Sequence, residues 1–161
     1  MKACKMIEIA IPGTASLVLQ HLVLDYNGTL ACDGVLLPGV RERLLVLAEN
    51  LQVHVVTADT FGQAREELTG VPCQLHILPS GKHTEAKLAY VEQLGAAGCV
   101  CIGNGRNDRL MLKEAALGIA VVQMEGASSA TLFAADVVTP SIQSALDLLL
   151  NPMRLVASLR E

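Results

Sequence analysis

The sequence contains very few aromatic side chains, with two Tyr, two Phe and no Trp among its 161 residues. Proteins that bind nucleic acid commonly combine a basic surface with aromatic side chains on which bases stack. Here the formal net charge is −4 at pH 7, and Lys and Arg form no basic stripe. We therefore expect no nucleic-acid partner.

Long hydrophobic runs are also missing, although 52% of the residues are hydrophobic. One of the longest apolar stretches, residues 115–122 with Gly118 inside it, is far shorter than the ~18 residues that a membrane span needs. The first thirteen residues place Glu8 inside an apolar stretch, with Pro12-Gly13 after it, which argues against a secretory signal. We expect a soluble, cytoplasmic protein with no membrane partner.

Cysteine is present in an odd number, five residues scattered along the chain, which does not fit a disulfide framework. Cys99 and Cys101 alternate on a predicted buried strand, where thiols behave as small hydrophobic groups. The chain has the length of one domain and shows no linker, repeat or low-complexity segment. We expect a single domain over residues 1–161, made of an N-terminal hairpin (1–20), a core (21–150) and a C-terminal helix (151–161).

Short runs of Leu and β-branched residues alternate with amphipathic segments, which is typical of a parallel sheet built from βαβ units. The predicted buried strands cover residues 21–25, 52–57, 74–78, 99–102, 118–122 and 135–138. The predicted helices cover residues 40–51, 60–69 and 83–94, follow Asn107 and Ser141, and begin again after Asn151-Pro152. Residues 6–11 and 16–20 flank a Pro-Gly turn and predict a β-hairpin before the first core strand.

Polar residues gather where three of these predicted strands end. The first strand leads into Asp25 and the segment DYNGT, the second ends at Thr57, and the fourth leads into the segment GNGRND, residues 103–108. Ligands of open parallel sheets bind beyond the carboxyl ends of the strands. A carboxylate, hydroxyl groups and amide oxygens at this edge suit a nucleophile and a Mg²⁺ site, and Lys87 on a nearby helix adds a positive charge. Taken alone, Asp25 is as readily a turn residue, and Lys87 a solvated surface lysine.

Together these segments resemble the motifs of the haloacid dehalogenase (HAD) superfamily. LVLDYNGTL, residues 22–30, is similar to the first motif, GNGRND to the GDGxND motif, and Thr57 and Lys87 fall where the second and third motifs belong. Thr57-Ala58-Asp59 and GNGRND also resemble the phosphorylation domain of P-type ATPases. The resemblance covers residues 21–147 and implies a three-layer Rossmann-like sandwich around a parallel sheet, in a soluble, capless relative of that domain.

The resemblance also implies roles for the matching residues. Asp25 is expected to attack phosphorus and form an aspartyl-phosphate that water hydrolyses. Thr57 and Lys87 are expected to bind the transferring phosphoryl group and neutralise its charge. Mg²⁺ is the implied cofactor. Its expected ligands are Asp25, the backbone carbonyl of Asn27, Asn104 and Asp108.

Two positions depart from the family pattern. Asn27 stands where hydrolytic members carry an Asp that acts as general acid and base, a function typically worth ~10²–10⁴-fold in rate. Asn104 replaces the first Asp of GDGxND, so the expected metal site loses one negative charge. Both changes replace a carboxylate by an amide of nearly the same shape, so we expect slow hydrolysis with preserved geometry.

The segments between the motifs are too short to hold a cap domain. Between Asp25 and Thr57 it allows a short flap at residues 31–37 and one helix, and between Thr57 and Lys87 a helix, a strand and loops. Without a cap, we expect the site to be open, which suits a macromolecular phosphate. Alternatively, a second subunit in a homo-oligomer shields it. The N-terminal hairpin is a candidate for that contact, because an unpaired edge strand invites pairing; equally, it folds back on its own sheet.

The sequence therefore predicts a Mg²⁺-dependent phosphohydrolase or phosphotransferase that acts through an aspartyl-phosphate on Asp25. The alternative is a catalytically silent HAD-like protein that binds phosphate or metal, in which Asn27 and Asn104 mark lost chemistry. No residue in the sequence identifies the phosphorylated substrate.

Overall fold

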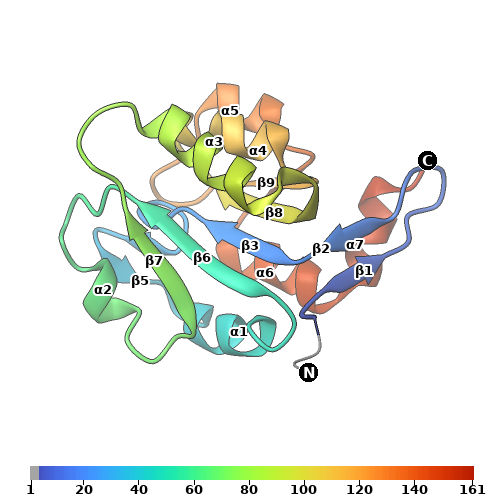
Figure 1. Cartoon of the computed structure of the whole chain (residues 1–161), viewed down its shortest axis with the longest axis horizontal. Helices are drawn as coiled ribbons and strands as arrows, with labels where there is room; N and C mark the ends of the chain where they lie inside the picture. Colours follow the sequence, from blue (N-terminus) through green and yellow to red (C-terminus); the bar gives the residue numbers. More distant parts are fainter. Residues whose placement is uncertain (1–3) are drawn as a thin grey trace.

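The computed structural model describes residues 4–161 and has a parallel sheet at its centre (Figure 1). The sheet order is β10-β9-β8-β3-β6-β7, and every neighbouring pair is parallel. Its strands are β3 (His21–Leu24), β6 (Gln52–Thr57), β7 (Cys73–Ile77), β8 (Cys99–Gly103), β9 (Leu117–Val121) and β10 (Val137–Thr139). These match the predicted strands to within about two residues, so the α/β class with a central parallel sheet is confirmed.

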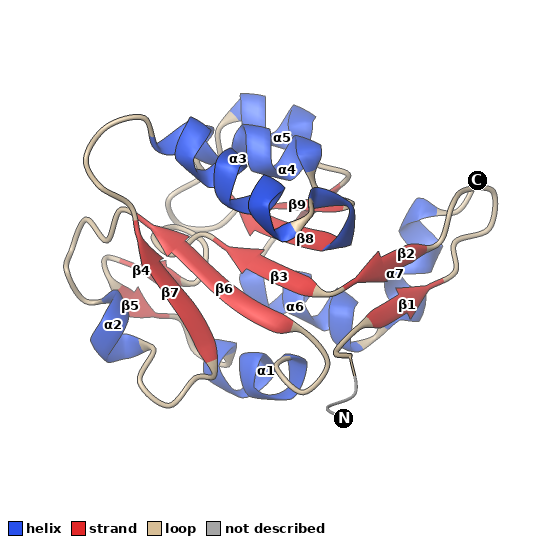
Figure 2. Cartoon of the chain, viewed as in Figure 1, coloured by secondary structure: helices blue, strands red, loops and turns tan. Residues whose placement is uncertain are grey.

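Helices cover both faces of this sheet, which makes three layers (Figure 2). One face carries α1 (Val40–Leu47) and α6 (Ile142–Leu150), and the other carries α3 (His83–Leu94), α4 (Arg109–Glu114) and α5 (Ser129–Ala134). The side chains of β3 alternate between these layers because successive residues of a strand point to opposite faces. Leu22 and Leu24 join the hydrophobic core under α1 and α6, whereas Val23 joins the core under α3 and α4.

Two predicted helices are shorter than the sequence pattern indicates, and one helix was not predicted. Instead of residues 60–69, α2 covers only Ala64–Glu67, because Asp59 and Gly62 adopt positive φ values of 50° and 70° and form a turn first. The Asp59 carboxylate accepts a hydrogen bond from the Ala64 backbone N–H (3.1 Å), at the start of α2. Helix α1 ends at Leu47 rather than at residue 51. Helix α5 has only six residues, and its N-cap residue Ser128 makes no side-chain capping hydrogen bond.

The flap predicted at residues 31–37 is a tight antiparallel hairpin. Its strands are β4 (Ala31–Cys32) and β5 (Val35–Leu36), joined by Asp33 and Gly34. Both turn residues have positive φ, 51° and 82°, which is the conformation that a two-residue hairpin turn requires. Apart from this flap, the segments between Asp25, Thr57 and Lys87 hold only α1, α2 and β7 with their loops, as predicted for a chain without a cap.

The N-terminal hairpin forms a separate antiparallel pair, β1 (Ile7–Ile9) with β2 (Leu17–Leu19), at the amino end of β3. It packs against the C-terminal helix α7 (Pro152–Leu159), since the buried residues Ile9, Leu19 and Leu155 belong to one hydrophobic cluster. Its pairing with a second copy of the chain stays a prediction. In the part of the chain that the structure describes, no helix is both long and apolar enough to cross a membrane.

A buried polar network lies between the sheet and α3. A hydrogen bond joins His21 Nδ1 to His54 Nε2 (3.1 Å), and a second joins His54 Nδ1 to the Tyr90 hydroxyl (2.8 Å). Burial, together with the neighbouring His21, lowers the pKa of His54 from 6.5 to about 4. A histidine with a lowered folded-state pKa stabilises the fold above its unfolded pKa and loses that contribution as the pH falls.

We predict that acidification destabilises the protein through His54. Between pH 7 and pH 5 its contribution to the free energy of unfolding should fall by about 2 kcal/mol, since the unfolded chain takes up the proton first. Urea titrations of the wild type and of His54→Phe measure this difference. His83→Gln, which removes a histidine outside the network, should keep the wild-type pH dependence. Equal pH dependence in wild type and His54→Phe would contradict the assignment.

Candidate active site

Asp25 follows β3 directly, at the carboxyl edge of the sheet and between the neighbouring strands β6 and β8. It continues the alternation of β3 toward the α3 layer, and its side chain meets Lys87 from that helix. Lys87 Nζ donates to Asp25 Oδ1 at 2.7 Å, and the Thr29 hydroxyl donates to Asp25 Oδ2 at 3.2 Å. Asp25 is only 7% exposed. Both of its oxygens are therefore oriented by partners inside the protein.

Lys87 is the only lysine among the buried residues of the described chain, with 1% of its surface exposed. Its ammonium group donates to Asp25 and to Asp108 Oδ1, both at 2.7 Å. Burial would lower the pKa of Lys87, but the two carboxylates outweigh burial and raise the pKa above its usual value. The lysine stays charged, and because an ammonium group has three N–H donors, one remains for a further acceptor.

Asp108 is fully buried and holds the GNGRND loop together. Its Oδ2 accepts hydrogen bonds from the backbone N–H groups of Asn104 (3.0 Å) and Gly105 (2.9 Å), while Oδ1 accepts from Lys87. Burial and the nearby Asp25 raise the pKa of Asp108, and Lys87 opposes that rise. Gly103 makes room for this carboxylate, since a Cβ there would lie 2.5 Å from it. Both oxygens of Asp108 therefore make internal contacts, and its role as a metal ligand stays a prediction.

Asn104 is brought next to Asp25 by the pairing of β8 with β3. Its Nδ2 donates to the carbonyl oxygen of Gly126 at 3.0 Å. Because only the amide nitrogen can donate, this bond turns Oδ1 toward Thr29, whose hydroxyl lies 3.2 Å away. Thr29 thus lies between the Asp25 carboxylate and the Asn104 amide oxygen.

Thr57 and Asn27 lie at the same sheet edge but outside this network. The Thr57 hydroxyl accepts a hydrogen bond from the Asp59 backbone N–H (2.9 Å), and no hydrogen bond within residues 4–161 joins it to Asp25. Asn27 is half-buried, and its Oδ1 is the one buried side-chain polar atom in the described residues without a hydrogen-bond partner. A buried acceptor left unpaired costs about 1–3 kcal/mol, so this oxygen needs a partner from outside the chain.

The donor set at this edge fits a magnesium ion. Asp25, Asn27 and Asn104 each offer a side-chain oxygen, the type of ligand atom that Mg²⁺ prefers, and Asn27 Oδ1 has no hydrogen-bond partner within residues 4–161. The ionised network of Lys87, Asp25 and Asp108 carries one positive and two negative charges, a net charge of −1. A divalent cation would neutralise this excess, which otherwise repels a phosphate.

Two features of the site were not predicted from the sequence. Thr29 was part of the quoted motif but had no expected role, although a hydroxyl four residues after Asp25 was the available signal. The loop after β9 was not considered. There, Gln123 Nε2 donates to the carbonyl oxygens of Gly28 (3.1 Å) and Thr29 (3.0 Å), over a sequence separation of more than ninety residues.

Comparison with known proteins gives one sequence relationship that decides the family. No family model matches the chain. The uncharacterized protein MJ0073 of Methanocaldococcus jannaschii is 46% identical over 85 residues, which are 50% of this chain and 91% of that protein. The chain belongs to the same family as MJ0073.

Solved structures identify the fold. The 3-deoxy-D-manno-octulosonate 8-phosphate phosphatase of Moraxella catarrhalis, in complex with magnesium, phosphate and KDO, superposes with a TM-score of 0.63 and 15% identity, covering 88% of this chain and 94% of that one. The cobalt-bound enzyme of Haemophilus influenzae gives a TM-score of 0.64 at 18% identity, covering 83% and 88%. The chain has the HAD-like fold of these phosphatases, as the sequence resemblance implied.

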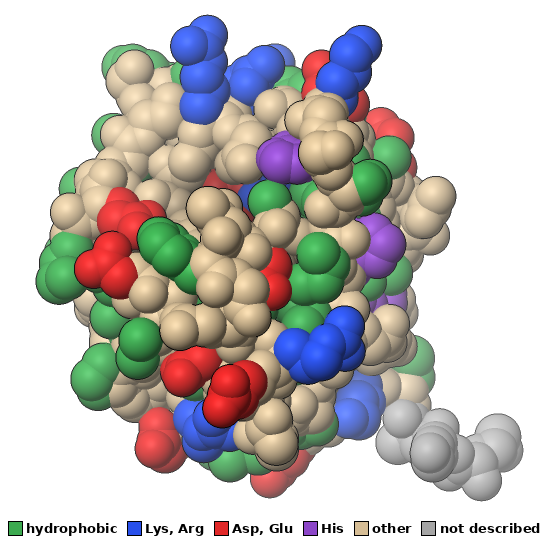
Figure 3. All heavy atoms as spheres, turned by 90° about the vertical axis from the view of Figure 1, so that its left-hand side faces the viewer, with side chains coloured by type: hydrophobic (Ala, Val, Ile, Leu, Met, Phe, Trp, Pro, Cys, Tyr) green, Lys and Arg blue, Asp and Glu red, His purple; other side chains and the backbone are tan. Residues whose placement is uncertain are grey.

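The face at the carboxyl ends of the strands is shown in Figure 3. The strands of Figure 1 point toward this side, so the view looks onto the sheet edge that holds Asp25. Basic side chains stand along the upper edge of the face and also at its right and lower parts, and acidic side chains lie on its left and lower parts and near its upper right.

Removing the Lys87 charge should destabilise the protein. Lys87→Met keeps the length of the side chain but leaves two buried carboxylates without a cation, and we expect the free energy of unfolding at pH 7 to fall by about 3–5 kcal/mol. The loss should shrink at about pH 5, because protonation of one carboxylate removes the unpaired charge. Urea denaturation in EDTA measures both values.

The exposed residue Lys113 offers a matched control on α4. Lys113→Met should change the free energy of unfolding by no more than about 0.5 kcal/mol, as is usual at the surface. If Lys87→Met is as stable as Lys113→Met at neutral pH, the buried ion pairs do not form in the folded protein.

Proposed function

We propose that the protein is a Mg²⁺-dependent phosphohydrolase or phosphotransferase that acts through an aspartyl-phosphate on Asp25. The observation that carries this proposal is the contact of the Asp25 carboxylate with the buried ammonium of Lys87, which Asp108 in turn holds. A carboxylate that an ammonium group and a hydroxyl group orient at the carboxyl edge of a parallel sheet is a suitable nucleophile for phosphorus.

In the proposed reaction an Asp25 oxygen forms a bond to phosphorus, and the bond from phosphorus to the leaving group breaks with its electron pair on the leaving group. Lys87 lies beside the attacking carboxylate, and its remaining N–H can donate to a phosphoryl oxygen, which offsets the charge that develops there. Water then attacks phosphorus, which releases inorganic phosphate and restores Asp25. In a transferase, an acceptor hydroxyl replaces this water.

The residues that would hold the metal are Asp25, Asn27 and Asn104. Bound Mg²⁺ would neutralise negative charge on the phosphoryl group and on Asp25. We propose that Asp108 positions Lys87 and the GNGRND loop rather than binding the metal directly, because it is fully buried, unlike Asp25, and accepts three internal hydrogen bonds. Thr29 joins Asp25 and Asn104 and positions both side chains.

Asn27 limits the leaving groups that the site can release. An alkoxide is strongly basic and needs a proton as it leaves, whereas the carboxylate that leaves an acyl phosphate does not. An amide at position 27 can neither donate that proton nor activate water. The proposal therefore favours acyl phosphates, with slow turnover of phosphate esters.

Acetyl phosphate tests the proposal directly. With Mg²⁺ it should add the mass of one phosphoryl group to the intact protein, and peptide analysis should place an acid-stable, base-labile adduct on Asp25. Asp25→Asn should show no adduct. A wild-type protein that forms no adduct while still binding phosphate or Mg²⁺ in calorimetry would instead support the silent binding protein.

Restoring the carboxylate at position 27 should change leaving-group selectivity. We predict that Asn27→Asp raises turnover of phosphate esters with poor leaving groups by up to about 10²-fold, and turnover of acetyl phosphate far less. Asn50→Asp, a substitution at an exposed site after α1, serves as the control and should change neither rate. Equal gains for esters and acetyl phosphate would mean that hydrolysis of the phosphoenzyme limits the wild type. No gain despite an adduct on Asp25 would remove position 27 from the acid–base step.

A further inference from the structure

A cavity of about 450 Å³ lies beside the candidate site, between the flap, the loop after β9 and the start of α6. Ala31, Cys32 and Leu37 line it from the flap side, and Met124, Glu125 and Pro140 line it from the other side. Most of this lining is apolar, and its volume lies in the range of about 300–1,000 Å³ that is typical of small-molecule sites. None of its lining residues is a lysine or an arginine.

The cavity shares a wall with the site around Asp25. Gly28 lines the cavity, and it adopts a φ of 80° with Asn104 Nδ2 and Glu125 Oε2 both in the space that a Cβ would fill. Asn104 and the adjacent Thr29 belong to the hydrogen-bonded network of Asp25. The cavity therefore lies next to the loop that carries Asp25, on the flap side of Gly28.

The neutral polar groups of the cavity are already used inside the protein. Gln123 donates to two backbone carbonyls, and its Oε1 accepts from the Ile142 backbone N–H at 2.7 Å. Gln143 Nε2 donates to the Pro38 carbonyl at 2.8 Å, and Ser141 Oγ accepts from the Ser144 N–H at 3.0 Å. These groups hold the walls in place and offer little to a ligand.

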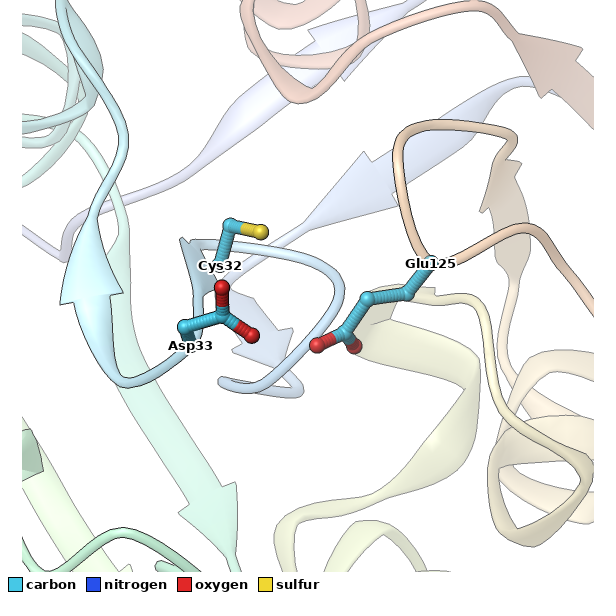
Figure 4. Close-up of side chains that lie close together, drawn as sticks. All are labelled: Cys32, Asp33 and Glu125. Atoms are coloured by element: carbon cyan, nitrogen blue, oxygen red, sulfur yellow. The ribbon is translucent and has the colours of Figure 1, made fainter.

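Glu125 differs from these lining residues because its polar group is not bonded inside the described part of the protein. Its carboxylate makes no ion pair or side-chain hydrogen bond within residues 4–161, and it faces Asp33 and Cys32 on the flap (Figure 4). One ligand atom from each of these three side chains lies within 4.8 Å of the others. Burial, Asp33 and Glu125 raise the pKa of the Cys32 thiol, which stays neutral. The mouth of the cavity thus presents two facing carboxylates and no neutralising cation.

We propose that this cavity binds the leaving group of the phosphorylated substrate and selects a leaving group with an apolar body and an ammonium group, which Glu125 and Asp33 receive. The inference rests on the proposed function, because the phosphoryl group of the same molecule sits at Asp25. The negative charges of Glu125 and Asp33 disfavour leaving groups that carry a further carboxylate or a second phosphate at the end far from the reacting phosphoryl group.

Three phosphates of equal length test this selectivity: ω-aminohexyl phosphate, heptyl phosphate and ω-carboxyhexyl phosphate. Their binding to Asp25→Asn with Mg²⁺, measured by calorimetry, does not depend on turnover. We expect the amino compound to bind about threefold more tightly than the neutral one and about tenfold more tightly than the carboxylate, as exposed charge pairs contribute modestly. Adding Glu125→Gln should remove most of this preference, whereas adding Glu114→Gln, at the exposed end of α4, should leave it.

Absence of binding, binding without a preference for the amino compound, or a preference that survives Glu125→Gln would each overturn the inference. The acetyl phosphate experiment separates this failure from failure of the proposed function. If Asp25 of the wild type becomes phosphorylated but the ammonium preference is missing, only the assignment of the cavity is wrong. If Asp25 forms no adduct, the proposed function itself fails.

Discussion

The buried ammonium group of Lys87 is the interaction on which the site depends. It joins α3 to the end of β3 through Asp25 and to the GNGRND loop through Asp108, with both contacts at 2.7 Å. Charges taken out of water cost several kcal/mol each unless they are paired with good geometry. Because Lys87 bonds to both carboxylates, the orientation of all three side chains depends on these two contacts. The Asp108 bonds to Asn104 and Gly105 extend this constraint to the backbone.

The same constraint explains how amides can replace carboxylates at two positions without disturbing the architecture. Asn104 is held by Gly126 and Thr29, and neither contact requires a negative charge. The charge excess of the site comes from Asp25 and Asp108, so the attraction for a divalent cation is reduced rather than lost. Asn27 retains the shape of an aspartate but not its proton chemistry. The proposed function therefore favours substrates whose leaving groups need no proton.

Much of this arrangement follows from the sequence because a parallel sheet has one carboxyl edge. Strands that each end in a polar residue bring Asp25, Thr57 and Asn104 to that edge, whatever the details of the loops. The sequence also brought Lys87 to this edge on a nearby helix, and the resemblance to HAD proteins strengthened its grouping with Asp25. The role of Thr29 as a bridge, the internal bonding of Asp108 and the contact of Gln123 with the Asp25 loop were not predicted. They depend on side-chain orientation and on a loop distant in sequence.

A crystal structure grown with Mg²⁺ and beryllium fluoride tests the central claim most directly, because beryllium fluoride mimics a phosphoryl group on a carboxylate. The account predicts beryllium bonded to an Asp25 oxygen, a fluoride within hydrogen-bonding distance of Lys87 Nζ, and Mg²⁺ ligated by Asp25 and Asn104 with Asp108 still on Lys87. Beryllium fluoride absent from Asp25 at saturating concentration, with Lys87 unchanged between the two carboxylates, would contradict it.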